Sequence, residues 1–368
     1  MLILSERGSI KIVMMPPRLA TVLSDQDRQF IDHLAPISQI LNIPMIVNHE
    51  ETESSIQNYY PQVKVIYKNS LDLGLYITQN FEIIYSCLPS PLFREIVFAA
   101  ELTFEKTVFN VWCPHGNSDK GHRSKYMESL SEERFALVYG QKMIDFLSEK
   151  GSLHQLEGVV RTGNYRLKYY NDNKGFYQKK LGRLIRFNRN KTILYAPTWK
   201  DNEDSSSFEG AIKRIMKTLP DHFNLLIKPH PHLFSSPELF ELFFYRFRTK
   251  KNVAVLPDFP PVYPVLDLAD IYLGDMSSVG YDFLSFKKPM FFLNTNKRNP
   301  EEDKGLYLTQ CGTLIETEDY DNIFSIIENT DPSPFEKIQT AVYGQVFGKE
   351  EDFKEKVMKV YERRCTYS

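Results

Sequence analysis

Short apolar runs recur along this chain, and each ends abruptly at a polar or helix-breaking residue. In the second half these runs are TILY (192–195), FNLLIK (223–228), IYL (271–273) and PMFFL (289–293). Such runs, bounded by Gly, Pro, His or Asp, are typical of buried strands. Stretches with helical spacing separate them, as at Phe208–Leu219. Strands that alternate with helices predict an α/β fold built on a parallel sheet.

The same rhythm continues through the rest of the chain, in a weaker form in its first half. Further strands are expected at Ile43–Val47, Val63–Tyr67, Glu82–Ser86, Thr107–Cys113, Phe135–Tyr139, Gly158–Arg161 and Val253–Leu256. Helices are expected at Phe93–Phe104, Pro237–Phe247, Val262–Leu268, Tyr320–Asn329, Ser333–Phe347 and Glu351–Arg364. Leu19–Leu23 and Phe30–Leu41 are expected to be partly helical.

The chain is too long for one small core. It has 368 residues, and a domain usually holds roughly 100–200. Asn164–Lys191 is polar, rich in tyrosine and basic, so it is expected to be a connection with a surface helix near Gly175–Arg186. A boundary between two domains is therefore predicted within or near this stretch.

Charge and cysteine content exclude several classes of protein. Lys and Arg number 45 and Asp and Glu 47, a net charge of -2 that gives no electrostatic case for nucleic-acid binding. The four cysteines are scattered without CxxC spacing, which indicates neither a zinc site nor a disulfide framework and fits a reducing cytosol. We expect no signal peptide in MLILSERGSIK and no membrane span, while peripheral attachment stays open.

Polar groups gather where four predicted strands end. These ends are Cys113–Lys120, Ala196–Lys200, Lys228–His232 and Asp275–Ser278. Ligands of parallel sheets bind beyond the carboxyl ends of the strands, and cations, hydroxyls and imidazoles together suit a diphosphate. Within Asp270–Phe283 a strand leads into two serines at a helix start, a natural anion site; the alternative is an ordinary capped helix.

Other familiar motifs are missing. The sequence has no GxxxxGKS or GxxxxGKT, no GxGxxG and no GxSxG, which weakens the P-loop, dinucleotide-binding and α/β-hydrolase interpretations. His230 and His232 have the spacing of a metal pair, but no third ligand is evident beside them, so no metal site is predicted. Each histidine has the alternative of a hydrogen-bonded loop residue.

Five segments together resemble the CDP-glycerol glycerophosphotransferase family, whose enzymes build teichoic acids and related phosphopolyols. They are Val111–Lys120 (VWCPHGNSDK), Gly163–Arg166 (GNYR), Ile193–Asp201 (ILYAPTWKD), Leu225–Pro231 (LLIKPHP) and Ala269–Phe292 (ADIYLGDMSSVGYDFLSFKKPMFF). This sequence departs from the family at three points. Cys113 and Pro114 separate Trp112 from His115, Lys200 replaces the usual Arg after APTW, and DMSS with Met276 replaces DYSS.

The resemblance implies a GT-B architecture, with two Rossmann-like domains facing across a cleft. Residues 1–170 would form the acceptor-side domain and residues 171–345 the donor domain. Residues 346–368 are expected to form a C-terminal helix that packs back on the first domain.

The resemblance also implies the reaction. A CDP-activated donor such as CDP-glycerol would pass its polyol phosphate to a hydroxyl on a lipid- or glycan-linked acceptor, without a cofactor. His115 is the candidate base, because an alcohol needs help to lose its proton near pH 7, and His230 is the second catalytic candidate. The donor or its phosphates would bind Thr198, Lys200, Lys228, Asp275, Ser277, Ser278 and Arg166, with Gly116 and Asp282 in support. For Arg166 a structural salt bridge is the alternative.

Three other functions stay open. They are a GT-B glycosyltransferase with a nucleotide-sugar donor, an isomerase of the UDP-sugar 2-epimerase type, and a non-catalytic nucleotide-binding module. Because the acceptor in this family is usually lipid-linked, the resemblance further implies that the protein acts in the cytoplasm, at the inner face of the membrane. Leu92–Phe104 and the basic run Lys179–Lys191 are the candidates for that contact. The oligomeric state is not predicted.

Overall fold

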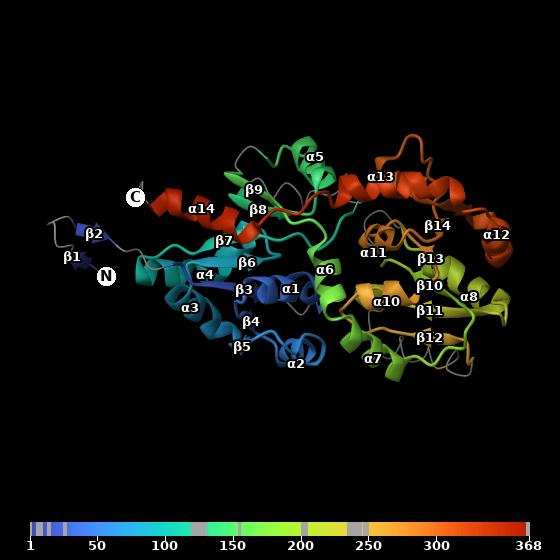
Figure 1. Cartoon of the computed structure of the whole chain (residues 1–368), viewed down its shortest axis with the longest axis horizontal. Helices are drawn as coiled ribbons and strands as arrows, with labels where there is room; N and C mark the ends of the chain where they lie inside the picture. Colours follow the sequence, from blue (N-terminus) through green and yellow to red (C-terminus); the bar gives the residue numbers. More distant parts are fainter. Residues whose placement is uncertain are drawn as a thin grey trace.

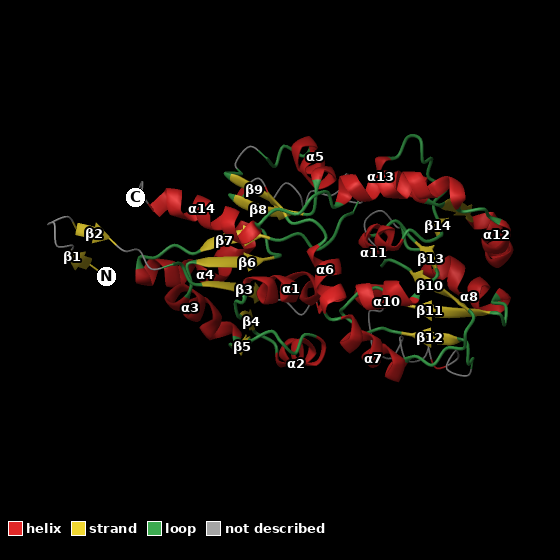
Figure 2. Cartoon of the chain, in the orientation of Figure 1, coloured by secondary structure: helices red, strands yellow, loops and turns green. Residues whose placement is uncertain are grey.

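The computed structural model describes residues 2–4, 10–12, 16–24, 28–118, 130, 132–153, 156–199, 205–233, 245 and 250–365. Lys200 and, except for Tyr245, the helix expected at Pro237–Phe247 lie outside these residues. Two α/β units lie side by side along the long axis of the molecule (Figure 1), each with a sheet covered by helices (Figure 2).

The first unit is built on a seven-stranded parallel sheet in the order β5-β4-β3-β6-β7-β8-β9. Its strands are β3 (Leu19–Leu23), β4 (Met45–Val47), β5 (Val65–Tyr67), β6 (Ile83–Ser86), β7 (Phe109–Trp112), β8 (Phe135–Val138) and β9 (Gly158–Arg161). Its helices are α1 (Ile31–Leu41), α2 (Glu50–Tyr59), α3 (Ser70–Asn80), α4 (Ser90–Phe104) and α5 (Gln141–Glu149). A separate antiparallel pair, β1 (Leu2–Leu4) and β2 (Ile10–Ile12), lies beyond this unit at the N-terminal end (Figure 1).

The helical prediction for Leu19–Leu23 is wrong, because this segment is the interior strand β3, between β4 and β6. Ala20 and Val22 are buried in one core cluster and Leu23 in another, so both faces of the strand are covered. A strand buried on both faces has no polar alternation, and its periodicity therefore does not separate it from a helix. The neighbouring expectation holds in part, since a helix, α1, does occupy most of Phe30–Leu41.

The second unit contains a six-stranded parallel sheet in the order β12-β11-β10-β13-β14-β15. Its strands are β10 (Lys191–Ala196), β11 (Phe223–Ile227), β12 (Val253–Val255), β13 (Ile271–Gly274), β14 (Met290–Asn294) and β15 (Thr313–Glu316). Its helices are α8 (Phe208–Thr218), α10 (Tyr263–Leu268), α11 (Ser278–Phe283), α12 (Ile323–Asn329) and α13 (Glu336–Val346). In α8 the buried Phe208, Ala211, Ile212 and Ile215 follow the spacing of one helix face, which packs on the sheet.

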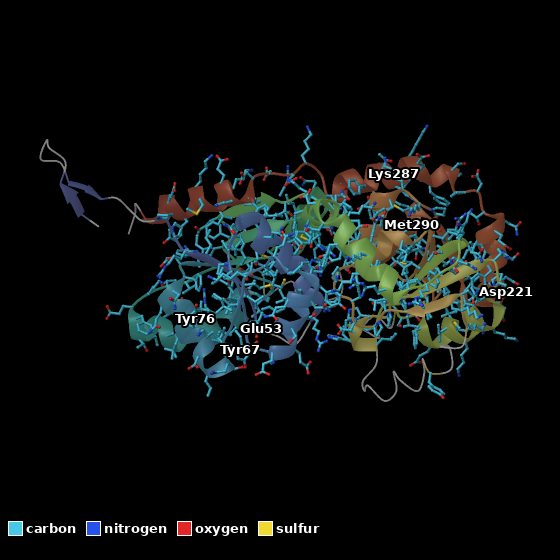
Figure 3. All side chains as sticks on the ribbon, turned by 60° about the horizontal axis from the view of Figure 1, so that its bottom comes forward. Glu53, Tyr67, Tyr76, Asp221, Lys287 and Met290 are labelled. Atoms are coloured by element: carbon cyan, nitrogen blue, oxygen red, sulfur yellow. The ribbon has the colours of Figure 1, made fainter. Side chains whose placement is uncertain are left out.

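Short 3-10 helices occur in both units, at Arg28–Phe30, Pro231–Leu233, Leu284–Phe286, Lys304–Cys311, Thr317–Asn322 and Ser333–Phe335. Side chains fill the space between the sheets and their helices in both units (Figure 3). No helix within the described ranges combines the length and the hydropathy that a bilayer span requires.

Two helices connect the units, α6 (Tyr165–Asp172) and α7 (Lys174–Leu184). The expected surface connection is only partly right, since all three tyrosines of α6 are buried. Tyr165 stacks on Tyr139 of the first unit at 5.9 Å between ring centroids. The tyrosines that suggested a polar linker are thus part of the interior between the units. A tyrosine suits this place because its ring packs while its hydroxyl forms a hydrogen bond.

The last helix, α14 (Phe353–Cys365), returns from the second unit to the first (Figure 1). Its Tyr361 contacts Phe109 of β7, and Phe353 contacts Tyr165. The chain therefore crosses between the units twice.

Candidate active site

A cavity of about 410 Å³ lies where the two units meet. The first unit lines it with Arg28, Asp32, His33, His115 and Gly116, and the second with Thr198, Trp199, Lys228, His230, His232, Ser277, Ser278 and Asp282. All four polar strand ends expected from the sequence contribute to it. The carboxyl ends of β7, β10, β11 and β13 thus meet at one cleft, as parallel sheets place them.

The loop after β7 brings the first unit against the second. His115 is exposed in it, with its ring 4.9 Å from that of Phe30. Gly116 has a φ of +127°, and a Cβ built there would lie 2.6 Å from Cβ of Ser278. Glycine is therefore required twice over at this position, by backbone conformation and by the approach of the other unit.

Lys228 supplies a cation to the cleft from the end of β11. Its side chain is half-buried, and desolvation lowers the pKa of its ammonium to about 8, although Asp32 and Asp258 favour the charged form. The group is therefore charged at neutral pH but close to its titration.

His230 has a defined tautomer when its ring is neutral. Its Nδ1 lies 3.1 Å from the backbone N–H of His232, which donates to it. The proton of the neutral ring is therefore on Nε2, where it can be donated to an oxygen anion. The ring also stacks on Trp199 at 6.0 Å, and His232 meets Trp199 edge-on at 5.5 Å.

Asp275 is buried between the ends of β13 and β10, at the point where the strand order of the second sheet reverses. Its carboxylate accepts the backbone N–H of Thr198 at 2.7 Å and that of Ser207 at 3.2 Å. Asp275 does not line the cavity. It thus supports the Thr198 loop, and a phosphate contact of Asp275 stays a prediction.

Ser277 and Ser278 open α11 at the cavity. Ser277 is the N-cap, but its hydroxyl makes no capping bond and lies 3.4 Å from the hydroxyl of Tyr272. Both serines are half-buried and line the cleft. The ordinary capped helix, in which the serine hydroxyl satisfies the backbone, is therefore not what forms here.

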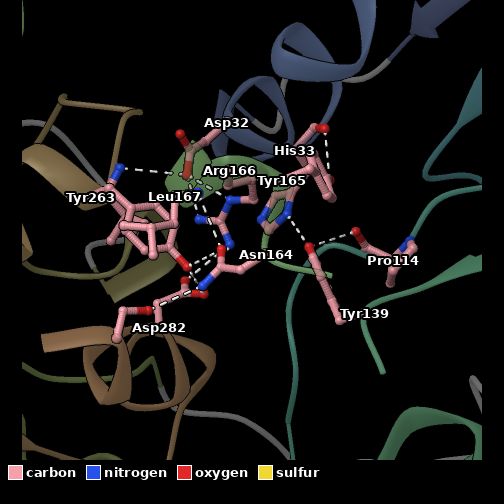
Figure 4. A network of polar contacts seen from close by, with 12 residues as sticks. Asp32, His33, Pro114, Tyr139, Asn164, Tyr165, Arg166, Leu167, Tyr263 and Asp282 are labelled. Carbon is pink, nitrogen blue, oxygen red and sulfur yellow. Dashed lines mark hydrogen bonds and ion pairs between the residues drawn. The ribbon is translucent and has the colours of Figure 1, made fainter. Parts of the chain in front are cut away.

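Arg166 forms a buried ion-pair cluster with two aspartates from different units (Figure 4). Its Nε donates to Asp32 of α1 at 3.1 Å, and its Nη1 donates to Asp282 of α11 at 3.0 Å. Tyr60 and Tyr263 donate their hydroxyls to the same carboxylates, at 2.6 and 3.0 Å. This geometry matches the salt-bridge alternative for Arg166, and a phosphate contact stays a prediction.

The charges in this cluster compensate one another. Burial disfavours the charged guanidinium and lowers its pKa. The negative charges of Asp282 and Asp32 outweigh this effect, so the pKa of Arg166 lies well above its usual value. Burial raises the pKa of Asp282, with Arg166 acting in the opposite direction. Each partner therefore keeps the other ionised in a place where neither would be stable alone.

Sequence reasoning missed Asp32 and His33, which reach the cleft from α1. His33 is buried, with Nδ1 2.7 Å from the hydroxyl of Tyr139. Burial, followed by the charges of Arg166 and His115, lowers the pKa of His33 well below its usual value. The one available signal was an adjacent acid and imidazole in the first turn of a largely apolar helix.

Two further observations bear on the chemistry. Among the described residues, no three His, Cys, Asp or Glu side chains come close enough to share a metal ion. Lys200 lies outside the described residues, so its role stays a prediction.

Two parallel-sheet units that meet at a polar cleft define a protein of GT-B architecture. Residues 156–352, more than half of the chain, match the family model described as CDP-Glycerol:Poly(glycerophosphate) glycerophosphotransferase. The chain belongs to this family, which confirms the resemblance drawn from its motifs.

Curated relatives agree with the family. The chain is 27% identical over 172 residues to a teichoic acid glycerol-phosphate primase of Bacillus subtilis (strain 168), covering 46% of this chain and 42% of the relative. It is 26% identical over 244 residues to a teichoic acid poly(ribitol-phosphate) polymerase of Bacillus spizizenii, covering 62% of this chain and 36% of that relative. The chain thus spans about two fifths of the length of the curated relatives it matches.

Solved structures confirm the fold. The wall teichoic acid polymerase TagF superposes with a TM-score of 0.63 at 15% identity, covering 95% of this chain and 90% of that one. A TagF variant soaked with CDPG gives a TM-score of 0.64 at 16% identity, covering 95% of this chain and 89% of that one.

Proposed function

We propose that this chain transfers glycerol phosphate, or a related polyol phosphate, from a CDP-activated donor to a hydroxyl acceptor in the synthesis of a cell-surface polymer. The observation that carries the proposal is the asymmetry of the cleft. The exposed imidazole of His115 lies on one side of the cleft. The cation of Lys228, the hydrogen-bond donor Nε2–H of His230 and two serines lie on the other side. A volume of about 410 Å³ is in the usual range for a small-molecule site.

The proposed step is an in-line displacement at the β-phosphorus of the donor. The acceptor oxygen forms a bond to that phosphorus while the bond to the bridging oxygen breaks, and CMP departs with the bonding electrons. His115 takes the proton of the hydroxyl. Lys228 and the Nε2–H of His230 face the negative charge that gathers on CMP. Groups fixed before the reaction in this way usually supply the largest catalytic term.

The relatives support two candidate donors. One relative is a glycerol-phosphate primase and another is a ribitol-phosphate polymerase, and a TagF variant was soaked with CDPG. We propose CDP-glycerol as the first donor and CDP-ribitol as the second. We place the activity in the cytoplasm at the inner membrane face, with a lipid- or glycan-linked acceptor. Cys87, Cys113 and Cys311 are not in disulfides, which agrees with a reducing compartment.

Ligand binding and CMP release test this function. We expect calorimetry to detect CDP-glycerol or CDP-ribitol but not UDP-N-acetylglucosamine, and CMP to be released only when a hydroxyl acceptor is added. Binding of the UDP-sugar alone would overturn the proposal in favour of a glycosyltransferase or epimerase. Donor binding without CMP release from any polyol acceptor would favour the non-catalytic module.

Replacement of the base gives the first prediction. His115→Gln is expected to lower turnover by about 10²–10⁴-fold, the usual contribution of general base catalysis, while the donor dissociation constant stays unchanged. His222→Gln is the control, because His222 is exposed and pairs with Glu328 away from the cleft. Wild-type turnover in His115→Gln would remove His115 from the mechanism.

A further inference from the structure

His33 has a place in the cleft that the proposed mechanism does not use. It lies in the first turn of α1, is buried and lines the cavity. Its Cε1 is 4.0 Å from the position that a Cβ on Gly116 would occupy. His33 therefore stands directly behind the loop that carries His115.

A chain of hydrogen bonds fixes the orientation and tautomer of His33 (Figure 4). Its Nδ1 lies 2.7 Å from the hydroxyl of Tyr139, and that hydroxyl donates to the carbonyl of Pro114 at 3.2 Å. A tyrosine hydroxyl has one proton, so both bonds form only if Nδ1 carries a hydrogen and donates it to Tyr139. The lone pair of the ring is then on Nε2.

The surroundings keep this ring uncharged. Burial opposes the imidazolium, and the nearby charges of Arg166 and His115 oppose it further, so the pKa of His33 lies well below its usual value. Tyr165 approaches only the backbone, donating its hydroxyl to the carbonyl of His33 at 2.9 Å. At neutral pH His33 is thus a neutral ring whose Nε2 accepts a hydrogen bond but does not take up a second proton.

We propose that Nε2 of His33 accepts a hydrogen bond from a hydroxyl of the polyol acceptor and so orients it beside His115. A lone pair repels the unprotonated oxygens of a diphosphate, so this nitrogen suits a hydroxyl rather than the donor. His33 binds the acceptor, and the proton of the attacking hydroxyl passes to His115. This inference rests on the proposed function, since it assigns the acceptor side of the same cleft.

Two amide variants distinguish the roles of the two ring nitrogens of His33. In His33→Asn the amide can take the place of Nδ1 toward Tyr139, and nothing replaces Nε2. With CDP-glycerol and a synthetic glycerol phosphate oligomer, this variant is expected to raise the KM for the oligomer about five- to tenfold, the usual effect of one lost hydrogen bond. The donor dissociation constant is expected to stay unchanged. His33→Gln, whose amide reaches the place of Nε2, is expected to restore part of the loss.

The kinetic result can overturn the inference in two ways. A wild-type KM for the oligomer in His33→Asn would show that Nε2 does not bind the acceptor. An equal loss of donor affinity would show that the residue acts on the whole cleft. The control is His222→Asn, because His222 lies outside the cavity.

Nitrogen NMR of the imidazoles tests the structural basis even if CDP-glycerol is not the donor. We expect a neutral His33 with its proton on Nδ1 at pH 7, and a change of tautomer population in Tyr139→Phe. A charged ring, or a proton on Nε2 in the wild-type protein, would overturn the inference. Absence of wild-type turnover with CDP-glycerol, beside the expected NMR result, would instead count against the proposed donor.

Discussion

The backbone of Gly116 is the place where the loop carrying His115 touches the start of α11. A Cβ there would lie 2.6 Å from Cβ of Ser278 and 3.0 Å from its hydroxyl, and the φ of +127° is itself unfavourable for any other residue. Gly116→Ala is therefore expected to displace the loop, weakening donor binding and turnover together, and to destabilise the protein by about 1–3 kcal/mol.

Gly182→Ala is the matched control for this prediction. Gly182 lies in α7, and a Cβ there would meet nothing within 4 Å. The control should be neutral or stabilising by about 0.4–1 kcal/mol, because alanine favours helix. Calorimetry and thermal unfolding measure both variants, and unchanged donor affinity in Gly116→Ala would show that the contact does not shape the cleft.

The titration of Lys228 gives a pH prediction. Its pKa is about 8, so the ammonium is charged at pH 7 and largely neutral at pH 9. Donor affinity is therefore expected to fall as pH rises through 8, by about tenfold for one lost charge-assisted hydrogen bond. Lys228→Met should bind weakly at both pH values, whereas Lys251→Met, which removes an exposed charge, should keep the wild-type profile. A flat wild-type profile would contradict the assignment.

The sequence predicted those site residues that directly follow a strand. His115, Lys228, His230 and Ser277 do so, and parallel strands bring such positions to one edge whatever the details of packing. Asp32 and His33 could not be found in this way. Their partners Tyr139 and Arg166 are 106 and 134 residues away in the chain, and only the tertiary packing of α1 brings them together.

At the scale of elements, the sequence located most strands of both sheets. The strand TLIE of β15 was missed because it is a short edge strand with only one fully buried residue. α6 was missed because its tyrosines and charges hide the apolar face, and β3 was assigned to the wrong class. These failures share a cause, since each element is defined by what packs on it rather than by its own periodicity.

The link between β13 and the loop after β10 gives an element-scale prediction. Asp275 accepts the N–H groups of both Thr198 and Ser207. Both N–H groups bond the same carboxylate oxygen, and in Asp275→Asn a neutral amide oxygen must accept them instead. Hydrogen bonds to a charged acceptor are roughly twice as strong as neutral ones, so the change is expected to cost about 1–3 kcal/mol. We expect a lower melting temperature, faster hydrogen exchange at the two amides and weaker donor binding.

The exposed Asp221, at the far end of the second unit (Figure 3), serves as the control for this variant. Asp221→Asn should leave all three measurements at wild-type values. If hydrogen exchange at Thr198 and Ser207 is unchanged in Asp275→Asn, the carboxylate does not hold the loop.

At the scale of the whole molecule, the cleft depends on how two units are held together. α6 lies between them, α14 returns to the first unit, and Arg166 pairs with Asp32 of one unit and Asp282 of the other. Because Asp282 is on α11, which begins at the two serines, this cluster fixes the donor-side helix against α1 and His33. The ion pairs therefore connect the stability of the fold with the geometry of the site.

Arg166→Met tests this connection. The variant leaves two buried carboxylates without their cation, a loss that usually destabilises a protein by about 3–5 kcal/mol at neutral pH. Burial already raises the pKa of Asp282, and the variant lacks the Arg166 cation that opposes this shift. A carboxyl whose folded-state pKa lies above its unfolded value contributes stability that is retained at low pH and lost as pH rises. Arg166→Met is therefore expected to be closer to wild type at pH 4.5 than at pH 7.5. Urea denaturation at the two pH values measures the difference.

Two controls make the test specific to the buried cluster. Lys168→Met removes an exposed ion pair with Glu350, 3.2 Å long, and should cost less than about 1 kcal/mol at either pH. The triple variant Asp32→Asn, Arg166→Met, Asp282→Asn removes all three charges and should recover much of the stability, because no unpaired charge remains buried. If the triple variant is stable but binds donor poorly, the cluster positions the units as well as stabilising them. Equal losses in Arg166→Met at both pH values would mean that the guanidinium acts through packing rather than through charge.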